Sequence, residues 1–261
     1  MNEEELKNPP IIEALVEVKW ALTKTSGLKP IDPHYQFLLG SFYERIKKQY
    51  PFHQPLPTSS IPDEFTGSVV KHRFRVEKDK WPLIQIGPGV MTVNETEKYT
   101  TFEKFKPLAV RAINDLFEAH PKREDLEITS LLLRYIDAKE IDYSQNNICN
   151  FISEKMHVPI ELPDFLFQDG RLEDTPTSFS WRTSLRCNNP EGMATLLFST
   201  GTRAGKPALI WEEMLKSKDA DIDDMPVKFE AWIDSAHEIV HTWFDKLIEG
   251  DLKEEFQKDE S

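Results

Sequence analysis

The order of the expected secondary-structure elements runs through the chain twice, and this repetition constrains the fold more than any other feature. Hydrophobic periodicity predicts a strand, a helix, three short strands and a long helix between Ile11 and His120. The same order of elements is predicted again between Leu126 and Ile248. The chain is therefore expected to contain two similarly built halves.

These boundaries divide the chain into three expected parts. Residues 1–125 form a first α+β half, residues 126–248 form a second α+β half, and residues 249–261 form an acidic C-terminal tail that frays. Two such halves pair most simply into one continuous antiparallel sheet with the helices on one face. The opposite face of the sheet must then be either solvated or occupied by a ligand or partner.

The composition is that of a folded protein with a sizeable core. The chain has 261 residues, 39% hydrophobic content, 16 Phe and 6 Trp, which argues against general disorder. No apolar run approaches the roughly 20 residues that cross a bilayer, so we expect a cytoplasmic protein with no membrane partner. Two cysteines are too few for a disulfide framework or a thiolate zinc site. The net charge of −13 disfavours duplex DNA as a default partner.

Arginines recur on one side of two expected strands. If the apolar side chains of their strand face the helices, Arg73 and Arg75 point to the open face of the sheet. Arg182 and Arg186 do the same from the matching strand of the second half, and Arg134 joins them by its parity. The planar guanidinium group suits carboxylate or phosphate recognition, so these arginines are the predicted binding residues.

The same arginines have a purely structural alternative. Glu13, Glu17 and Glu77 could pair with them across neighbouring strands as a solvated ladder, worth about 0.2–1 kcal/mol per pair. The register of the strands decides between the two interpretations, and register cannot be read from the sequence.

The segment His237-Glu238-Ile239-Val240-His241 has the pattern of zinc-dependent hydrolases. In that pattern two histidines one helical turn apart bind zinc, and the glutamate activates the bound water. Only 20 residues follow His241 to supply a third ligand, and a helical wheel places Glu238 opposite the apolar stripe that His237 flanks. A packed helix edge is therefore expected, with no catalytic residue, metal or cofactor, and a zinc site is the alternative.

Four ordered motifs are similar to those of a known family. They are Asn8–Glu13 (NPPIIE), Gly87–Asn94 (GPGVMTVN), Leu133–Asp137 (LRYID) and Trp232–Glu238 (WIDSAHE). On these motifs the chain resembles an uncharacterised, sporadically distributed prokaryotic family of about this length, which usually has Asn at the position of Asp137. The resemblance implies a bacterial or archaeal cytoplasmic protein and supplies no activity. The order of elements in each half is also similar to the tandem saddle of TATA-binding proteins, as an analogy of architecture only.

These observations favour a non-enzymatic binding or regulatory protein that engages another protein through the open sheet face. A small anionic ligand or nucleic acid are alternative occupants of that basic face. A homodimer is a further option that the sequence leaves open. The sporadic distribution of the resembling family is compatible with a bacterial defence or toxin-neutralising module. The alternative is a zinc-dependent hydrolase with Glu238 as general base, and a third is a sensor of small ligands.

Overall fold

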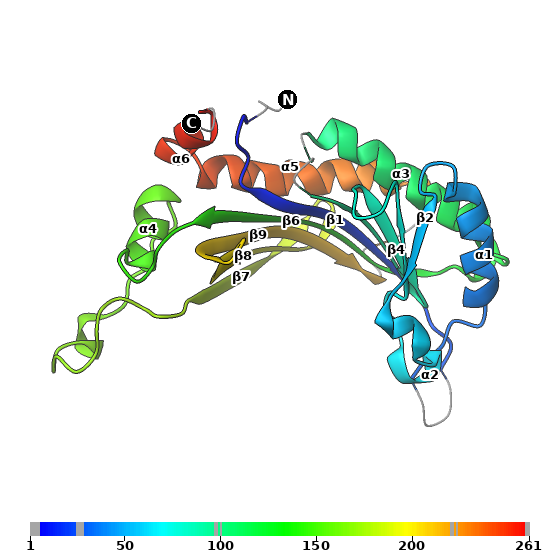
Figure 1. Ribbon diagram of the computed structural model, residues 1–261, viewed down its shortest axis with the longest axis horizontal. Coiled ribbons are helices and arrows are strands. Elements are labelled where there is room, and N and C mark those ends of the chain that lie inside the picture. The colour runs from blue at the N-terminus through cyan, green and yellow to red at the C-terminus, as the bar shows by residue number, and fades with distance from the viewer. Residues whose placement is uncertain are drawn as a thin grey trace.

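A computed structural model of the chain describes residues 6–24, 29–96, 99, 101–219, 222 and 224–258. They form an antiparallel sheet of nine strands in the order β2-β3-β4-β5-β1-β6-β9-β8-β7, which confirms the expected α+β class and continuous sheet (Figure 1). The strands are β1 (Ile11–Trp20), β2 (Phe52–Pro55), β3 (His72–Arg75), β4 (Leu83–Gly87), β5 (Val90–Glu95), β6 (Ile128–Glu140), β7 (Ser180–Asn188), β8 (Glu191–Arg203) and β9 (Lys206–Lys218). The α-helices are α1 (Tyr35–Ile46), α2 (Asp63–Thr66), α3 (Phe102–Ala119), α4 (Ile148–Lys155), α5 (Phe229–Leu247) and α6 (Asp251–Phe256).

The pairing of β1 with β6 joins the two parts of the sheet. Val16 lies opposite Leu133 in this pair, and both side chains are at most 1% exposed. The strands of residues 11–95 all lie on the β1 side of the pair, and those of residues 128–218 all lie on the β6 side. This central pair therefore ties the N-terminal and C-terminal strands into one hydrogen-bonded unit.

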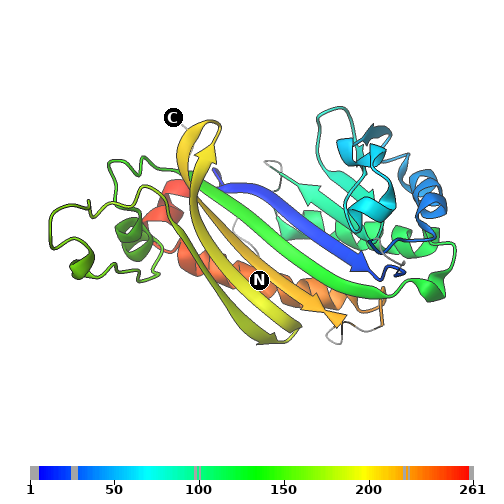
Figure 2. The same cartoon turned by 90° about the horizontal axis from the view of Figure 1, so that it is seen from below.

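Two long helices pack along one face of the sheet. In Figure 1, α3 and α5 cover the upper face of the arched sheet, and α1 lies beside α3 at the β2 end. α3 buries Phe105, Ala109 and Leu116 because these apolar residues recur at the spacing of one helical face. Short α2 lies below the sheet at the β2 end, so the helices do not all share one face. Figure 2 shows the central strands from below, where neither α3 nor α5 covers them.

The acidic C-terminal segment, expected to fray, is folded as far as Lys258. Leu252 and Phe256 of α6 are only 2% and 5% exposed, and they join a second apolar cluster with Ile148 and Ile248. The expectation failed because these two apolar side chains lie four residues apart and form the inner face of a helix. Residues 259–261 lie outside the described residues.

Candidate functional site

The pairing register places the predicted arginines on the open face of the sheet, which is the face opposite α3 and α5. They are Arg73, Arg75, Arg134, Arg182 and Arg186. Residues directly opposite each other in antiparallel strands point to the same side. Cα partners run across the sheet from Arg75 through Leu15 to Arg134 and on to Ser184. The remaining arginines share this side because side chains alternate along each strand.

Three of these arginines are engaged within the chain. The guanidinium of Arg134 lies 2.7 Å from the carboxylate of Glu212. Arg73 donates two hydrogen bonds to the amide oxygen of Gln85, at 3.1 and 2.9 Å. Arg75 is buried and donates to the carbonyl oxygen of Lys80 at 3.0 Å. Their first role is therefore to hold neighbouring strands and turns together.

The glutamates that were expected to pair with the arginines have other partners. Glu17 pairs with Lys19 at 2.8 Å, and Glu13 accepts a hydrogen bond from the side-chain amide of Asn94 at 2.7 Å. In the described part of the chain, neither these two nor Glu77 forms an ion pair with the predicted arginines. The register thus gives a different ladder from the one suggested by the sequence.

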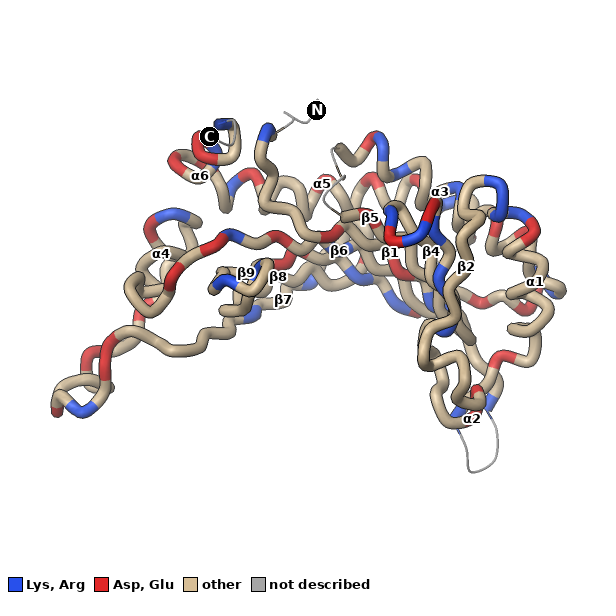
Figure 3. Tube along the Cα trace, in the orientation of Figure 1, with Lys and Arg blue, Asp and Glu red and all other residues tan. Residues whose placement is uncertain are grey.

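Arg182 and Arg186 differ from the other three because both are exposed on β7, a strand at the end of the sheet. Within the described residues, neither forms an ion pair or hydrogen bond. β7 is nine residues long, whereas the opposite edge strand β2 has four residues and ends in Pro55. Figure 3 shows that Lys and Arg positions recur along the strands of the sheet, interspersed with Asp and Glu. The β7 edge is therefore the most accessible basic part of this face.

The structure places the residues of the zinc pattern on different sides of α5. His237 is 9% exposed and His241 half-buried, and both face the sheet, whereas Glu238 is exposed to solvent. The His241 ring instead lies 3.4 Å from the carboxylate of Asp245. Among the described residues, no group of three or more His, Cys, Asp or Glu is arranged to hold a metal ion. The geometry therefore gives the zinc alternative no support.

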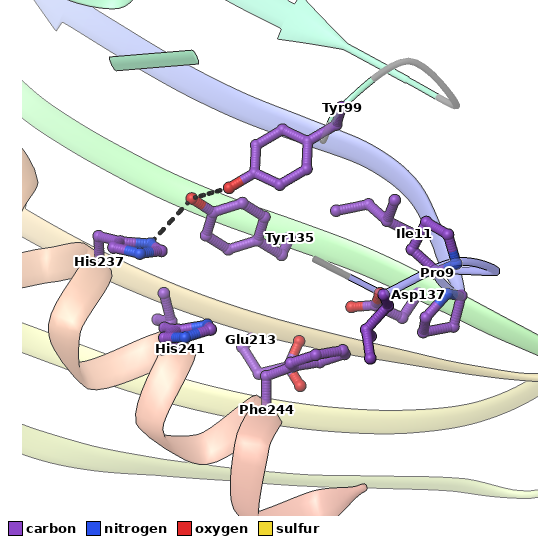
Figure 4. A pocket seen from close by; sticks show the side chains of 12 residues that line it. Pro9, Ile11, Tyr99, Tyr135, Asp137, Glu213, His237, His241 and Phe244 are labelled. Carbon is purple, nitrogen blue, oxygen red and sulfur yellow. Dashed lines mark hydrogen bonds between the residues drawn. The ribbon is translucent and has the colours of Figure 1, made fainter. Parts of the chain in front are cut away.

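A second candidate site, which the sequence did not reveal, is a cavity of about 80 Å³ between α5 and the sheet. The N-terminal segment closes one side through Pro9 and Ile11, and α5 contributes His237, His241 and Phe244 (Figure 4). The remaining polar side chains come from Tyr99, β6 and β9. Parts of the chain more than 200 residues apart in sequence thus meet around one small space.

A chain of hydrogen bonds runs along the wall of this cavity. The Tyr99 hydroxyl donates to the Tyr135 hydroxyl at 3.1 Å, and the Tyr135 oxygen lies 3.1 Å from Nδ1 of His237. The His237 ring stacks on Phe102, with 3.8 Å between ring centroids, and on His241, with 5.1 Å. These contacts fix the orientation of the aromatic wall.

Two buried carboxyl groups lie at the sheet side of the cavity. Tyr135 is opposite Glu213 in the β6–β9 pair and Asp137 is opposite Trp211, so Asp137 and Glu213 are diagonal neighbours on one face. Burial raises the pKa of Asp137 to about 7, and burial together with the Asp137 carboxyl raises the pKa of Glu213 well above its usual range. The buried pair therefore resists carrying two negative charges.

Replacing Tyr135 with Phe is expected to destabilise the protein by about 1–2 kcal/mol, because two hydrogen bonds of the aromatic wall are lost. Urea unfolding measures the change. Tyr35→Phe is the matched control, since the Tyr35 hydroxyl is buried and makes no hydrogen bond with the described residues. This second variant should be neutral or stabilising by up to about 1 kcal/mol. Equal losses in both variants would contradict the assigned network.

No helix among the described residues is long and apolar enough to cross a membrane. Comparisons of the chain with protein-family models, curated proteins and solved structures gave no match. The interpretation of both candidate sites therefore depends on their geometry.

Proposed function

We propose that this chain is a non-enzymatic binding protein that takes an extended acidic segment of a partner protein along the β7 edge of its open face. The observation that carries this proposal is the exposure of Arg182 and Arg186 on a free edge strand, without partners among the described residues. Arginine pairs well with carboxylates because its planar fork can donate two parallel hydrogen bonds.

The geometry of β7 suits the addition of a strand. An edge strand presents a row of unpaired backbone donors and acceptors, and an extended peptide can extend the sheet by pairing with it. Arg182 and Arg186 would then contact every second side chain of the peptide on the open face. Leu185, 55% exposed on the other face of β7, would contact the alternate side chains.

The charge of β7 favours an acidic partner over a second copy of the chain. In an antiparallel self-pairing centred on Ser184, Arg182 of one copy would lie opposite Arg186 of the other. Like charges directly opposite each other destabilise paired strands. An acidic segment would meet the same positions with opposite charge.

The two-halved organisation of the chain is part of this proposal. The order strand, helix, strands, helix occurs in β1 to α3 and again in β6 to α5, which supports tandem copies of one unit. In such a chain the two outermost strands need not be equivalent. β2 is short and ends in Pro55, which has no backbone N–H to pair with an added strand, whereas β7 contains no proline. Binding is therefore assigned to the C-terminal half.

The test is the affinity of a fluorescent nine-residue peptide that alternates Glu with Val, measured by fluorescence anisotropy. We expect the Arg182→Glu, Arg186→Glu double variant to bind at least about tenfold more weakly, because attraction becomes like-charge repulsion. Added salt should weaken binding to the wild type, since exposed charges are screened. Hydrogen exchange of β7 amides should slow when the peptide is bound.

Arg171→Glu is the matched control, because Arg171 is 85% exposed in its side chain and lies on a loop. It changes the net charge in the same sense and should leave the affinity within about twofold, since it removes no contact of the open face. The proposal fails if a Lys-Val peptide binds as tightly as the Glu-Val peptide, or if the double variant binds like the wild type.

A further inference from the structure

The carboxyl groups of the α5 cavity have too few hydrogen-bond donors. Asp137 and Glu213 are 1% and 0% exposed. In the described part of the chain, no N–H group or hydroxyl donates to Oδ2 of Asp137 or to either carboxylate oxygen of Glu213. Among the described residues, the only proton available to these oxygens is one that the two carboxyl groups share with each other. Ionised carboxylate oxygens buried without donors are strongly unfavourable, so a group that donates to them is stabilised at this position.

The protein's own polar groups do not meet this demand. The guanidinium of Arg203 approaches from the end of β8, but it donates to the carbonyl oxygen of Ala138 at 2.7 Å. The indole N–H of Trp211 lies near the Glu213 carboxyl but outside hydrogen-bonding geometry. A small rotation of this ring could satisfy one of the three oxygens and would leave the other two.

The cavity walls specify an organic ligand. Pro9, Ile11 and Val240 provide apolar surface, and the rings of Tyr99, Tyr135 and Phe244 are of the kind whose faces favour cations. The described residues offer no cluster of three or more ligands for a metal ion. A volume of about 80 Å³ accommodates on the order of five to eight water-sized groups.

We infer that this cavity binds a small primary alkylammonium ion through Asp137 and Glu213. An ammonium group carries three N–H donors, so it can serve the three oxygens that lack one once it displaces the proton that the carboxyl pair otherwise holds. The alkyl chain of the ligand would lie against Ile11, Val240 and Phe244. The ring faces of Tyr99 and Tyr135 would enclose the same alkyl chain from the side. Neither a quaternary ammonium nor an alcohol could satisfy the same oxygens.

Affinity should depend on pH because the ligand competes with protons for the carboxyl pair. The titratable or charged groups around the pair are Tyr99, Tyr135, His237, His241 and Arg203. Because burial raises the pKa of Asp137 to about 7, protons displace the ligand below that pH. An alkylammonium keeps its own proton throughout this range, as a lysine side chain does. We expect the affinity to fall by roughly tenfold for each pH unit below pH 7.

The experiment is a calorimetric titration of the wild type with n-butylammonium and with n-butanol, its neutral counterpart of equal size, at pH 8 and pH 6. For n-butylammonium we expect a Kd between about 10 µM and 1 mM at pH 8, within the limit for five non-hydrogen atoms. Butanol should bind at least about 30-fold more weakly, and so should butylammonium to Asp137→Asn or Glu213→Gln.

Glu140→Gln is the matched control, because it removes a carboxylate from the exposed end of β6 and should change the Kd less than about twofold. Amide chemical shifts of β6 and β9 provide a second readout for the wild type that needs no variant. Equal binding of butanol and butylammonium would overturn the inference, as would an affinity that rises from pH 8 to pH 6. So would the absence of both heat and shifts at about 10 mM ligand, ten times the weakest expected Kd.

Discussion

Replacing Asp137 with Asn is expected to stabilise the protein at pH 8 and to reduce the dependence of its stability on pH. The pKa of Asp137 is raised from 3.8 to about 7 in the folded protein, mainly because the carboxyl is buried. Between these values the folded protein retains a proton that the unfolded chain releases. The free energy of unfolding therefore decreases as pH rises from about 4 to about 7, and this contribution is absent above pH 7.

The expected size follows from the shift in pKa. Each unit corresponds to about 1.4 kcal/mol, so holding Asp137 ionised at pH 8 costs the folded state up to about 4 kcal/mol. Asparagine has nearly the same shape, carries no charge and can donate to Glu213. We expect Asp137→Asn to raise the free energy of unfolding by about 2–4 kcal/mol at pH 8, and by only about 1–2 kcal/mol at pH 5.

Urea unfolding at pH 5, 6.5 and 8 measures this effect. A residual pH dependence should remain in the variant, because the pKa of Glu213 is also raised by burial. Glu140→Gln, on the exposed end of the same strand, should change stability by less than about 0.5 kcal/mol at each pH. A wild type that becomes more stable from pH 5 to pH 8, with a destabilised Asp137→Asn variant, would contradict the raised pKa.

The side of the sheet on which the arginines lie could be predicted, whereas their partners could not. Alternation along a strand fixes which side chains share a face, and this holds whatever the neighbouring strand is. The pairing of Arg134 with Glu212 depends on the register of β6 against β9. That register is set by packing across the sheet, between segments about 80 residues apart in sequence.

The α5 cavity was missed for a related reason, although one signal was present. Its walls come from the N-terminal segment, β6, β9 and α5, and only the tertiary fold brings these together. Yet Asp137 follows Leu133 and Tyr135 at every second position of β6, so it faces the core as they do. Glu213 in turn lies between Trp211 and Leu215, which face the core at alternate positions of β9. An acidic residue at an inward position of an apolar strand predicts a buried carboxyl group.

Strand β2 was not expected because three of its features are weak in sequence. It has four residues, it ends in Pro55, and it lies in a segment rich in proline. Its pairing with β3 places His53 opposite Phe74, and their rings stack with 5.0 Å between centroids. Tertiary contacts of this kind override local strand propensity.

Gly87→Ala is expected to destabilise the protein by about 3 kcal/mol or more, because the GPGV motif is required for close packing of backbone. Gly87 ends β4, and a Cβ atom at this position would lie 1.9 Å from the carbonyl oxygen of Val69. A backbone oxygen cannot move away as the end of a flexible side chain can. The segment before β3, which is hydrogen-bonded alongside β4 through Lys71 and Ile86, would have to shift.

Gly40→Ala is the matched control, since it makes the same chemical change with the opposite expected sign. Gly40 is exposed in the middle of α1, and a Cβ atom there would meet nothing within 4 Å. Alanine is favoured over glycine in a helix interior by about 0.5–1 kcal/mol, so this variant should be more stable by that amount. Urea unfolding of both variants measures the difference. A Gly87→Ala variant as stable as the wild type would show that the approach of β4 to Val69 is not needed, and the motif would then require a role beyond packing.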